Sequence, residues 1–511
     1  MKRNLSFQLC SVAACMLAAL VAGAEDVSFM EPLFVPRPAE VTIRTNECVS
    51  LSSVKVSCAN DGDKAAAWAA GRCAKWFGGV PAVEAAFSGE PVPGGDEAYE
   101  LSADASGVAI RANTIRGVRH AMHTLRQSAM PERGTLRTKG WILPGMEIRD
   151  RPALSFRGIH FCWFPTVSFE QMERYVRMAA YYKFNYAVIE CWGVYKWKNT
   201  PDFAWPDANV TADDIKRLCA IAEDEGLTLL PQLNAFGHAA MSRFVGGKHA
   251  TLDLKPEYEP VFEPLGGWNW CMTNPETRKV LDSMMAELCE AFGNPPYFHI
   301  GCDEAEKPSC PTCRAADYAE LLLGHLTHIH DFLSARKCRA MMWHDMLIER
   351  GDPRWKGFYA KGDVKTAAIA ERLPKDVVIC DWFYGKAKEA YPTLDYFKSL
   401  GYDVLTCPWG KKEGIDAQTA HARKIGLYGI LATTWHGARG RDFCGLMINN
   451  SHAAWGTDAA RYGRSFGIIT YATHLRQVGW DMGLKHRDST GFVTDDFPAR
   501  MWVEDVDKLI D

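Results

Sequence analysis

The 511-residue sequence lacks a strong excess of charge of either sign, and beyond its amino terminus it lacks long hydrophobic runs. Its 58 lysine and arginine residues are balanced by 62 aspartate and glutamate residues, which gives a formal net charge of -4. This balance argues against nucleic acid or an anionic membrane surface as the main partner. No later segment has the roughly 20 uninterrupted apolar residues of a membrane-spanning helix, so no membrane span is expected. A composition of 47% hydrophobic and 23% charged residues excludes a disordered or fibrous chain.

The amino terminus predicts export. The basic pair Lys2-Arg3 is followed by an apolar stretch over residues 10–21, which is too short to cross a bilayer comfortably, and then by three small residues, 22–24. We therefore expect residues 1–24 to be a signal peptide and the mature protein to be periplasmic or secreted. A loose lipoprotein cleavage box ends at Cys15, but the apolar run continues past that cysteine, which favours plain export over lipid anchoring.

Cysteine is present in an odd number once the signal peptide is removed. Fifteen of the 17 cysteines then remain, and in an exported chain they cannot all pair internally. Only Cys310-Pro311-Thr312-Cys313 has close spacing, and a local disulfide, a metal half-site and two plain thiols all fit it. The histidines that follow, His325, His328 and His330, have the spacing of one exposed helix face. Because no clear fourth ligand accompanies them, no metal is expected.

The first part of the mature chain, residues 25–150, predicts a small α+β domain. Apolar and polar residues alternate over Tyr99–Ala103 and again over Val108–Ala112. Ser106-Gly107 supplies a turn between them, so a β-hairpin is expected. Helical periodicity near Lys64–Phe77 and Ile115–Gln127 places one helix before this hairpin and one after it.

From residue 151 to residue 511, strand and helix patterns alternate eight times before a carboxyl-terminal tail. The expected strands are Phe156–Phe161, Tyr186–Trp192, Thr228–Asn234, Tyr297–Cys302, Ala340–Trp343, Val377–Trp382, Val404–Pro408 and Gly429–Trp435. Capping residues such as Ser168, with Gln171, and Thr211 mark helix starts between them. Eight such units over roughly 300 residues predict an α/β fold, the (β/α)8 TIM barrel. In that fold the chemistry lies at the carboxyl ends of the strands.

Tryptophan is abundant, and it is concentrated at these strand ends. The chain has 17 tryptophans, and five of the eight expected strand ends carry one: Trp192, Trp343, Trp382, Trp409 and Trp435. Aromatic faces stack on the C–H faces of sugars, so this distribution predicts a carbohydrate-binding mouth. The alternative is coincidental aromatic packing.

Two adjacent carboxylates, Asp303 and Glu304, follow the fourth expected strand. Carboxylates at the end of a buried strand are costly unless each has a partner or a chemical task. One can be held ionised while the other keeps its proton, and cleavage of a glycosidic bond needs an acid beside an anion in this way. Elsewhere in a chain such a pair would suggest a salt-bridged surface turn, but this position favours catalysis.

The stretch Tyr297–Glu304 reads Tyr-Phe-His-Ile-Gly-Cys-Asp-Glu and resembles the His-x-Gly-Gly-Asp-Glu signature of glycoside hydrolase family 20, the β-N-acetylhexosaminidases. Four further stretches are similar to the family's: Phe156-Arg157-Gly158, Pro231–His238, Thr273–Thr277 and Gly117–Gln127. The resemblance covers nearly the whole mature chain. It implies a divergent, secreted glycoside hydrolase that removes terminal β-linked N-acetylhexosamine (GlcNAc or GalNAc) from glycans and needs no metal or organic cofactor.

The resemblance also implies a retaining, substrate-assisted mechanism, in which the sugar's acetamido oxygen attacks the anomeric carbon and an oxazolinium ion forms. Asp303 would orient the acetamido N–H and stabilise its positive charge. Glu304 would protonate the leaving oxygen and then deprotonate water. The implied substrate-binding residues are Arg157, through a bidentate hydrogen bond, and Glu190, Trp343, Trp382, Tyr384, Trp409 and Trp435. Support for the two carboxylates would come from Glu190, His238 and His299.

Several positions depart from the family pattern. They are Cys162 in place of an aspartate, Gln232 and Asn234 in place of two carboxylates, Cys302 in place of a glycine, Trp409 where a Tyr-x-Asp is expected, and Gly437 in place of a glutamate. Tyr384 is a candidate for the missing tyrosine. We expect altered recognition of the sugar's 4- and 6-hydroxyls. Two alternatives stay open: a catalytically weak carbohydrate-binding barrel, and a barrel glycosidase that acts on another sugar with a protein nucleophile.

Overall fold

The computed structural model describes residues 31–86, 90–133, 138–191, 193–240, 251–263, 266–435, 443–457 and 464–483. The predicted signal peptide, Trp192 and Gly437 lie outside these residues. The chain divides into two compact units, one ending at Arg151 and the other beginning at Pro152. Among the described helices, none combines the length and apolar character needed to cross a membrane.

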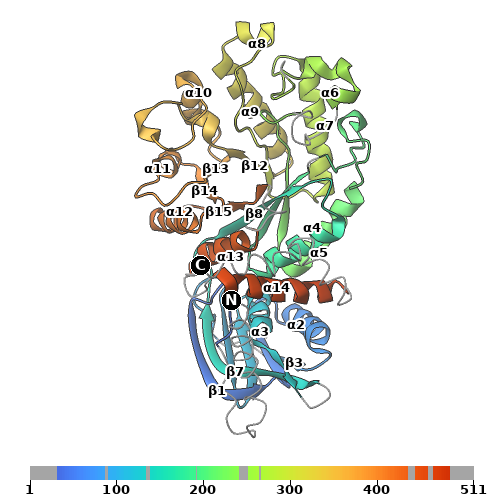
Figure 1. The fold of residues 1–511 in the computed structure, drawn as a ribbon, viewed down its shortest axis with the longest axis vertical. Coiled ribbons are helices and arrows are strands. Elements are labelled where there is room, and N and C mark those ends of the chain that lie inside the picture. The colour runs from blue at the N-terminus through green and yellow to red at the C-terminus, as the bar shows by residue number, and fades with distance from the viewer. Residues whose placement is uncertain are drawn as a thin grey trace, which may run out of the picture. The chain divides into compact units, whose positions relative to one another are not determined.

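The first unit has the predicted α+β architecture. Its seven-stranded sheet has the order β1-β7-β4-β5-β2-β3, with β6 paired to β7. The strands are β1 (Glu40–Ser50), β2 (Ser53–Cys58), β3 (Ala82–Ala86), β4 (Tyr99–Asp104), β5 (Gly107–Ala112), β6 (Met130–Arg133) and β7 (Thr138–Asp150). The antiparallel pair β4–β5 is the predicted hairpin. Helices α2 (Gly62–Phe77) and α3 (Ile115–Ser128) lie against the sheet (Figure 1).

The second unit is the predicted barrel. Eight parallel strands close in the order β10-β11-β12-β13-β14-β15-β8-β9. They are β8 (Phe156–Trp163), β9 (Tyr186–Cys191), β10 (Thr228–Gln232), β11 (Tyr297–His299), β12 (Arg339–Trp343), β13 (Val378–Phe383), β14 (Asp403–Pro408) and β15 (Gly429–Thr433). Each coincides with an expected strand, so the fold class is confirmed.

Helices follow the strands around the barrel (Figure 1). They are α4 (Phe169–Tyr181), α5 (Ala212–Glu225), α6 (Thr251–Leu254), α7 (Pro275–Ala291), α8 (Pro311–Ala315), α9 (Tyr318–Ser334), α10 (Val364–Ala368), α11 (Pro392–Ser399), α12 (Lys412–Ile425), α13 (Phe443–Trp455) and α14 (Arg464–Asp481). The expected caps are present, since Ser168 and Gln171 form a capping box at α4 and Thr211 caps α5.

The interior of the barrel changes from apolar to polar along the strands. Its apolar part includes Phe156, at the start of β8, which stacks on Tyr186 with ring centroids 4.3 Å apart. Towards the carboxyl ends buried polar side chains join the apolar ones, and they include His160, Glu190 and His299. Because buried polar groups are costly unless they are partnered, this gradient places the candidate chemistry at the carboxyl end of the barrel.

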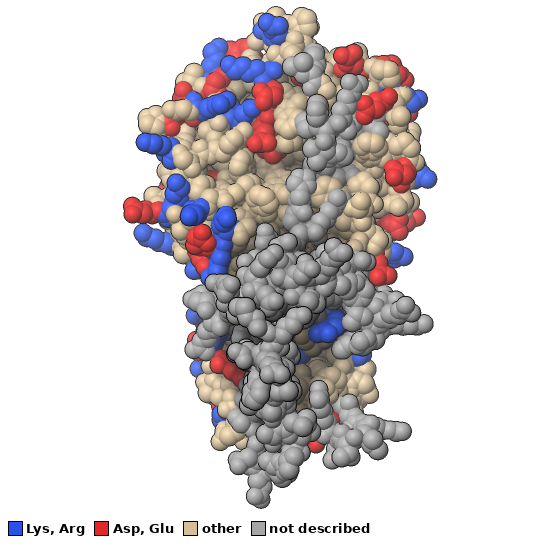
Figure 2. Space-filling model, in the orientation of Figure 1, with Lys and Arg blue, Asp and Glu red and all other residues tan. Residues whose placement is uncertain are grey.

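Charged side chains of both signs are interspersed on the face drawn in Figure 2. No patch of a single sign gathers over the described residues of this face. This distribution agrees with the near balance of acidic and basic residues in the sequence.

Candidate active site

The carboxylates Asp303 and Glu304 follow β11 through a strained turn. The strand ends at His299 instead of at the predicted Cys302, because Gly301 and Cys302 have φ angles of 67° and 73°. The Gly301 N–H donates to His299 Nδ1 at 3.1 Å and closes the turn. Non-glycine residues rarely adopt such angles, and strain of this kind gathers at functional sites. Cysteine in place of glycine at position 302 therefore affects the backbone as well as the packing.

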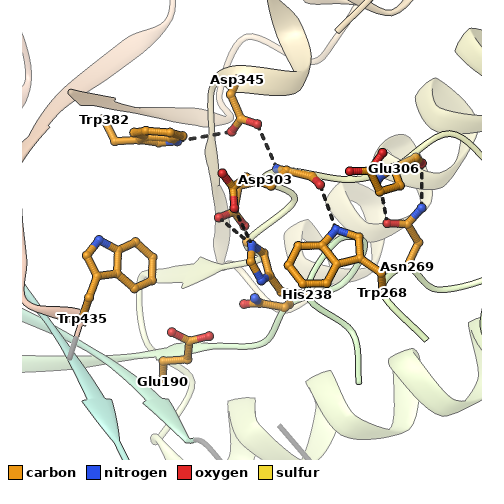
Figure 3. Close-up of polar contacts among 12 residues, drawn as sticks. Glu190, His238, Trp268, Asn269, Asp303, Glu306, Asp345, Trp382 and Trp435 are labelled. Carbon is orange, nitrogen blue, oxygen red and sulfur yellow. Dashed lines mark hydrogen bonds and ion pairs between the residues drawn. The ribbon is translucent and has the colours of Figure 1, made fainter. Parts of the chain in front are cut away.

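His238 lies against both carboxylates, and Figure 3 shows it beside Asp303. Its Nε2 is 3.4 Å from Asp303 Oδ2 and 3.3 Å from Glu304 Oε2. The neighbouring Gly237 makes this approach possible, since a Cβ there would lie 2.1 Å from the Asp303 carbonyl oxygen. The structure thus brings together the two predicted catalytic residues and one of their predicted supports.

The charge state of His238 follows from its neighbours. Burial by itself lowers the pKa of an imidazole, but the carboxylates of Asp303 and Glu304 outweigh it and raise the pKa of His238 to about 10. The ring is therefore protonated at neutral pH. The single Nε2–H of His238 faces both carboxylates and carries one positive charge. That charge can hold one carboxylate as an anion while the other carries a proton. Acid catalysis beside an anion needs one protonated and one ionised carboxyl group in this way.

The backbone of Glu304 is held from both sides by the side chains of Asp345 and Trp268, which are labelled in Figure 3. Its N–H donates to Asp345 Oδ2 at 2.9 Å, and its carbonyl oxygen accepts from Trp268 Nε1 at 2.8 Å. Trp382 Nε1 donates to the other Asp345 oxygen at 3.3 Å. Burial, aided by the charge of Asp303, raises the pKa of Asp345 to about 7.

Neither Asp345 nor Trp268 was predicted as a site residue. Asp345 could have been found, because it follows the fifth strand at the same barrel end. Trp268 is on a loop 36 residues before Glu304, and nothing in the local sequence marks it.

Aromatic rings form one wall of the site. Trp382 stacks on Tyr384 with ring centroids 4.9 Å apart, and Tyr359 lies 4.8 Å from Trp382. Trp435 Nε1 donates to the Tyr384 hydroxyl at 2.8 Å, and Trp409 meets Tyr384 edge-on at 5.4 Å. All five rings keep some exposure to solvent. The predicted residues Trp382, Tyr384, Trp409 and Trp435 are therefore assembled into one surface.

Tyr359 is a member of this wall that the sequence did not predict. Burial and then the charge of Glu304 raise the pKa of the Tyr359 phenol, which places its hydroxyl close to that carboxylate. It lies in the loop between β12 and β13, whose path is not encoded in a local motif.

Trp343 lies beneath the aromatic wall. Its side chain is 0% exposed, and its ring centroid is 4.3 Å from that of His299 and 5.6 Å from that of Trp435. Trp343 packs beneath His299 and Trp435, whose rings cover it. Direct contact of Trp343 with the sugar stays a prediction.

Glu190 lies one residue before the end of β9, as expected, but it is buried. Its Oε2 is 3.2 Å from His160 Nε2 and 3.6 Å from Cys162 Sγ. It also lines a small cavity of about 30 Å³, together with Gln232 and Asn234. The Gln232 amide donates to Asn234 Oδ1 at 3.0 Å. The two residues that stand in place of the family's carboxylates therefore form a neutral hydrogen-bonded pair. Direct contact of Glu190 with substrate stays a prediction.

Arg157 does not belong to the site. It lies near the amino end of β8, where Nε donates to the Lys183 carbonyl at 3.0 Å and Nη1 to the Leu154 carbonyl at 2.9 Å. The side chain is 0% exposed. Successive strand residues face opposite sides, and Phe156 points into the barrel, so Arg157 points out of it. The predicted bidentate contact with sugar hydroxyls is wrong.

Asp381 and His344 form a buried pair behind Trp382. His344 Nε2 is 3.4 Å from Asp381 Oδ1, and His344 Nδ1 accepts from the Trp382 N–H at 3.3 Å. Burial raises the pKa of Asp381 to about 7 and lowers the pKa of His344 to about 3. The pair is therefore neutral in mildly acidic solution, and it positions the backbone of a wall residue.

We expect Asp381→Asn to gain stability relative to the parent protein as the pH rises. Burial raises the pKa of Asp381 from 3.8 in the unfolded chain to about 7 in the folded one. The protonated carboxyl therefore stabilises the folded state fully below pH 3.8, and this stabilisation is lost as the pH rises through about 7. Each pKa unit corresponds to about 1.4 kcal/mol. Thermal unfolding midpoints of both proteins at about pH 5 and about pH 8 measure the effect. An equal difference between the proteins at the two pH values would contradict it.

The three histidines of α9 do not form a cluster. His325 is buried, and its Nε2 contacts the Ala235 carbonyl at 2.8 Å, which corrects the prediction of one exposed face. His328 pairs with Asp282, and His330 pairs with Asp376. Each imidazole thus has its own structural partner.

Comparison with known proteins gives a consistent result. A model described as glycosyl hydrolase family 20, domain 2, matches residues 31–151, and one for the family's catalytic domain matches residues 184–409. A β-hexosaminidase of Porphyromonas gingivalis is 24% identical over 316 residues, which cover 54% of this chain and 38% of that one. A β-hexosaminidase of Vibrio furnissii is 23% identical over 357 residues, 61% of this chain and 51% of that one. The chain thus spans about half or less of the length of these relatives.

Solved structures show the same fold. An exo-β-N-acetylglucosaminidase of Vibrio harveyi aligns with a TM-score of 0.65 at 17% identity, over 89% of this chain and 79% of that one. A β-N-acetylhexosaminidase of Bacteroides fragilis aligns with a TM-score of 0.63 at 18% identity, over 88% of this chain and 96% of that one. The two family models together match more than half of the sequence, and the chain therefore belongs to glycosyl hydrolase family 20.

Proposed function

We propose that this chain is a retaining β-N-acetylhexosaminidase that removes terminal β-linked GlcNAc or GalNAc from glycans. The observation that carries the proposal is the cluster of Asp303, Glu304 and His238 at the carboxyl end of the barrel, beside an aromatic wall. Family membership supports the reaction class. The names of the relatives support the type of sugar.

The proposed mechanism is substrate-assisted. The acetamido oxygen of the sugar attacks its own anomeric carbon while Glu304 gives a proton to the leaving oxygen, and an oxazolinium ion results. Asp303 accepts a hydrogen bond from the acetamido N–H and offsets the positive charge that develops there. In the second half, Glu304 takes a proton from water, which opens the ring with net retention. His238 balances the negative charge of the pair throughout.

Recognition of the sugar's 4- and 6-hydroxyls is proposed to differ from the family pattern, in which more carboxylates are expected at the site. Apart from Asp303 and Glu304, which act at the acetamido group and the leaving oxygen, the carboxylate predicted to bind the sugar is Glu190, and it is engaged with His160. The exposed ring of Trp409 offers an apolar surface at the mouth. Stacking therefore supplies much of the binding, and discrimination between the gluco and galacto sugars should be modest.

The test uses nitrophenyl β-glycosides and a thiazoline that mimics the oxazoline. We expect hydrolysis of the N-acetylglucosaminide and the N-acetylgalactosaminide and competitive inhibition by the thiazoline. The matched control is the nitrophenyl β-glucoside, which lacks the acetamido group and should not be hydrolysed. Hydrolysis that the thiazoline leaves unchanged would identify a protein nucleophile instead, and sugar binding without hydrolysis would identify a binding protein.

We also propose that the chain is exported, on the basis of its first 24 residues. A basic start, a short apolar stretch and small residues at the cleavage position support this. Amino-terminal sequencing of the protein from fractionated cells tests it. A new amino terminus near Glu25 in the exported fraction supports export, whereas an intact amino terminus in the cytoplasm contradicts it.

A further inference from the structure

A second cluster of reactive side chains lies outside the proposed catalytic centre. It consists of Glu263, Cys271, Cys310 and Cys313, whose ligand atoms all lie within 4.8 Å of one another. Cys271 lies between β10 and α7, four residues before the start of α7. Cys310 caps the amino terminus of α8, and Cys313 lies within that helix. The sequence reveals only the last two, because Cys271 is 39 residues and Glu263 is 47 residues before Cys310.

The sulfur atoms are spaced as ligands of one tetrahedral metal ion. Cys271 Sγ is 3.8 Å from Cys310 Sγ and 3.7 Å from Cys313 Sγ. Zinc–sulfur bonds of about 2.3 Å in a tetrahedral arrangement place two sulfur atoms about 3.8 Å apart. Disulfide sulfur atoms are bonded at about 2.05 Å, so neither measured pair is a disulfide.

Glu263 supplies an independent indication that a cation belongs here. Its side chain is 4% exposed, and Oε2 accepts from the N–H groups of Ser309 and Cys310, each at 2.8 Å. The other oxygen, Oε1, is buried and has no hydrogen bond of normal geometry among the described residues, and the side chain that interacts with this carboxylate there is the Cys313 thiol. No described basic side chain forms an ion pair with Glu263. A buried carboxylate that faces only thiols is costly unless a positive charge lies between them.

We propose that Glu263, Cys271, Cys310 and Cys313 bind one zinc ion. Three thiolates and one carboxylate complete four-coordination by the protein, which is typical of structural zinc and leaves no open position for substrate. Thr273 Oγ1 lies 3.1 Å from Cys313 Sγ and can donate to the thiolate, as partners behind metal ligands do.

The position of the site indicates what the ion does. It would join residues 261–263 and 266–273 to residues 303–313, which begin with the proposed catalytic carboxylates. Hydrogen bonds already join these segments: besides the contacts of Glu263 with Ser309 and Cys310, Trp268 donates to Glu304, and Asn269 and Glu306 bond to each other. A zinc ion fixes this connection more strongly than hydrogen bonds alone, so it would position the loop that carries Asp303 and Glu304 without contacting the sugar.

The first experiment measures metal in the purified full chain. After dialysis against metal-free buffer, elemental analysis should find one zinc ion per chain, and replacement by Co²⁺ should give the sulfur-to-cobalt absorption and the intense visible bands of a tetrahedral thiolate site. An organomercurial reagent should release the zinc. These measurements use the unaltered protein, so they do not depend on whether a variant folds. They are also independent of hydrolysis, so the metal site can fail while the proposed function stands.

The second experiment assigns the ligands. Cys271→Ser and Cys313→Ser should reduce bound zinc to roughly a tenth or less of the parent's content, and Glu263→Gln should weaken retention during dialysis. The matched control is Cys338→Ser, which changes an equally buried thiol outside the cluster and should keep one zinc ion. Folding of each variant is checked by circular dichroism.

Two outcomes would overturn the zinc site, and a third would overturn the assignment of its ligands. One is an unaltered protein without zinc whose three thiols are all alkylated rapidly under native conditions. The other is a disulfide among Cys271, Cys310 and Cys313 found by mass spectrometry of the unreduced protein. Equal loss of zinc in the Cys338→Ser control would also reject these four ligands.

Discussion

Glu304→Gln should lower kcat for aryl N-acetylglucosaminides with poor leaving groups by about 10²–10⁴-fold, the range of general acid–base catalysis. Glutamine has the shape of glutamate, and the backbone contacts from Asp345 and Trp268 do not involve the altered atoms. The site should therefore keep its form while it loses its proton donor. KM should change much less than kcat.

The dependence on the leaving group makes this test specific. A dinitrophenolate departs without protonation, so for that substrate the first step of Glu304→Gln should be nearly as fast as in the parent. A plot of log(kcat/KM) against leaving-group pKa should consequently be steeper for the variant. Parallel plots would contradict the acid role of Glu304. Glu320→Gln is the control, because it removes an exposed carboxylate paired with Arg372, and such pairs contribute little.

The barrel could be predicted from sequence because its signals are local. Alternation of strand and helix, capping residues such as Ser168 and Thr211, and carboxylates after a strand are all contained in short segments. The position of Asp303 and Glu304 at the catalytic end followed from the parallel strand order alone. The same reasoning could have excluded Arg157, which stands near the start of its strand and not at its end.

The rest of the site depends on contacts that no local pattern contains. Trp268 and Tyr359 reach Glu304 from loops whose paths are set by tertiary packing. Trp343 is fully buried whereas Trp409 is exposed, and no local pattern tells which tryptophan at a strand end will be covered by other side chains. Cys271 and Glu263 approach the Cys310–Cys313 pair only when two loops of the barrel mouth meet.

Asp303→Asn should lower kcat for N-acetylglucosaminides by about 10²–10³-fold, the usual loss when one electrostatic stabiliser of a transition state is removed. Asparagine can still accept a hydrogen bond from the acetamido N–H, but it carries no charge to offset the oxazolinium ion. Binding of the cationic transition state therefore weakens more than binding of the substrate. Inhibition by the thiazoline should weaken in the same proportion, because that inhibitor resembles the charged intermediate.

Acetamido participation distinguishes this role from that of a nucleophile. Replacing the substrate's acetyl group by trifluoroacetyl makes its oxygen a poorer nucleophile, so hydrolysis by the parent protein should slow sharply. If Asp303 attacked the sugar itself, the fluorinated substrate would react about as fast as the acetyl one, and a covalent glycosyl-aspartate would accumulate with a slow substrate. The change in the parent's rate on fluorination of the substrate thus decides which atom attacks the anomeric carbon. The change in kcat of Asp303→Asn decides how much Asp303 contributes.

The imidazole of His238 provides a second readout that does not depend on turnover. Its raised pKa reflects two adjacent carboxylates, at 3.4 Å and 3.3 Å from Nε2. Removing the charge of Asp303 leaves one of them, so titration of the His238 ring by NMR should give a pKa below the parent value of about 10. Asp282→Asn, which changes the partner of His328, should leave the His238 titration unchanged. A His238 pKa that is the same in Asp303→Asn and in the parent would show that the two side chains are not electrostatically coupled. The assignment of a protonated His238 between two carboxylates would then be wrong.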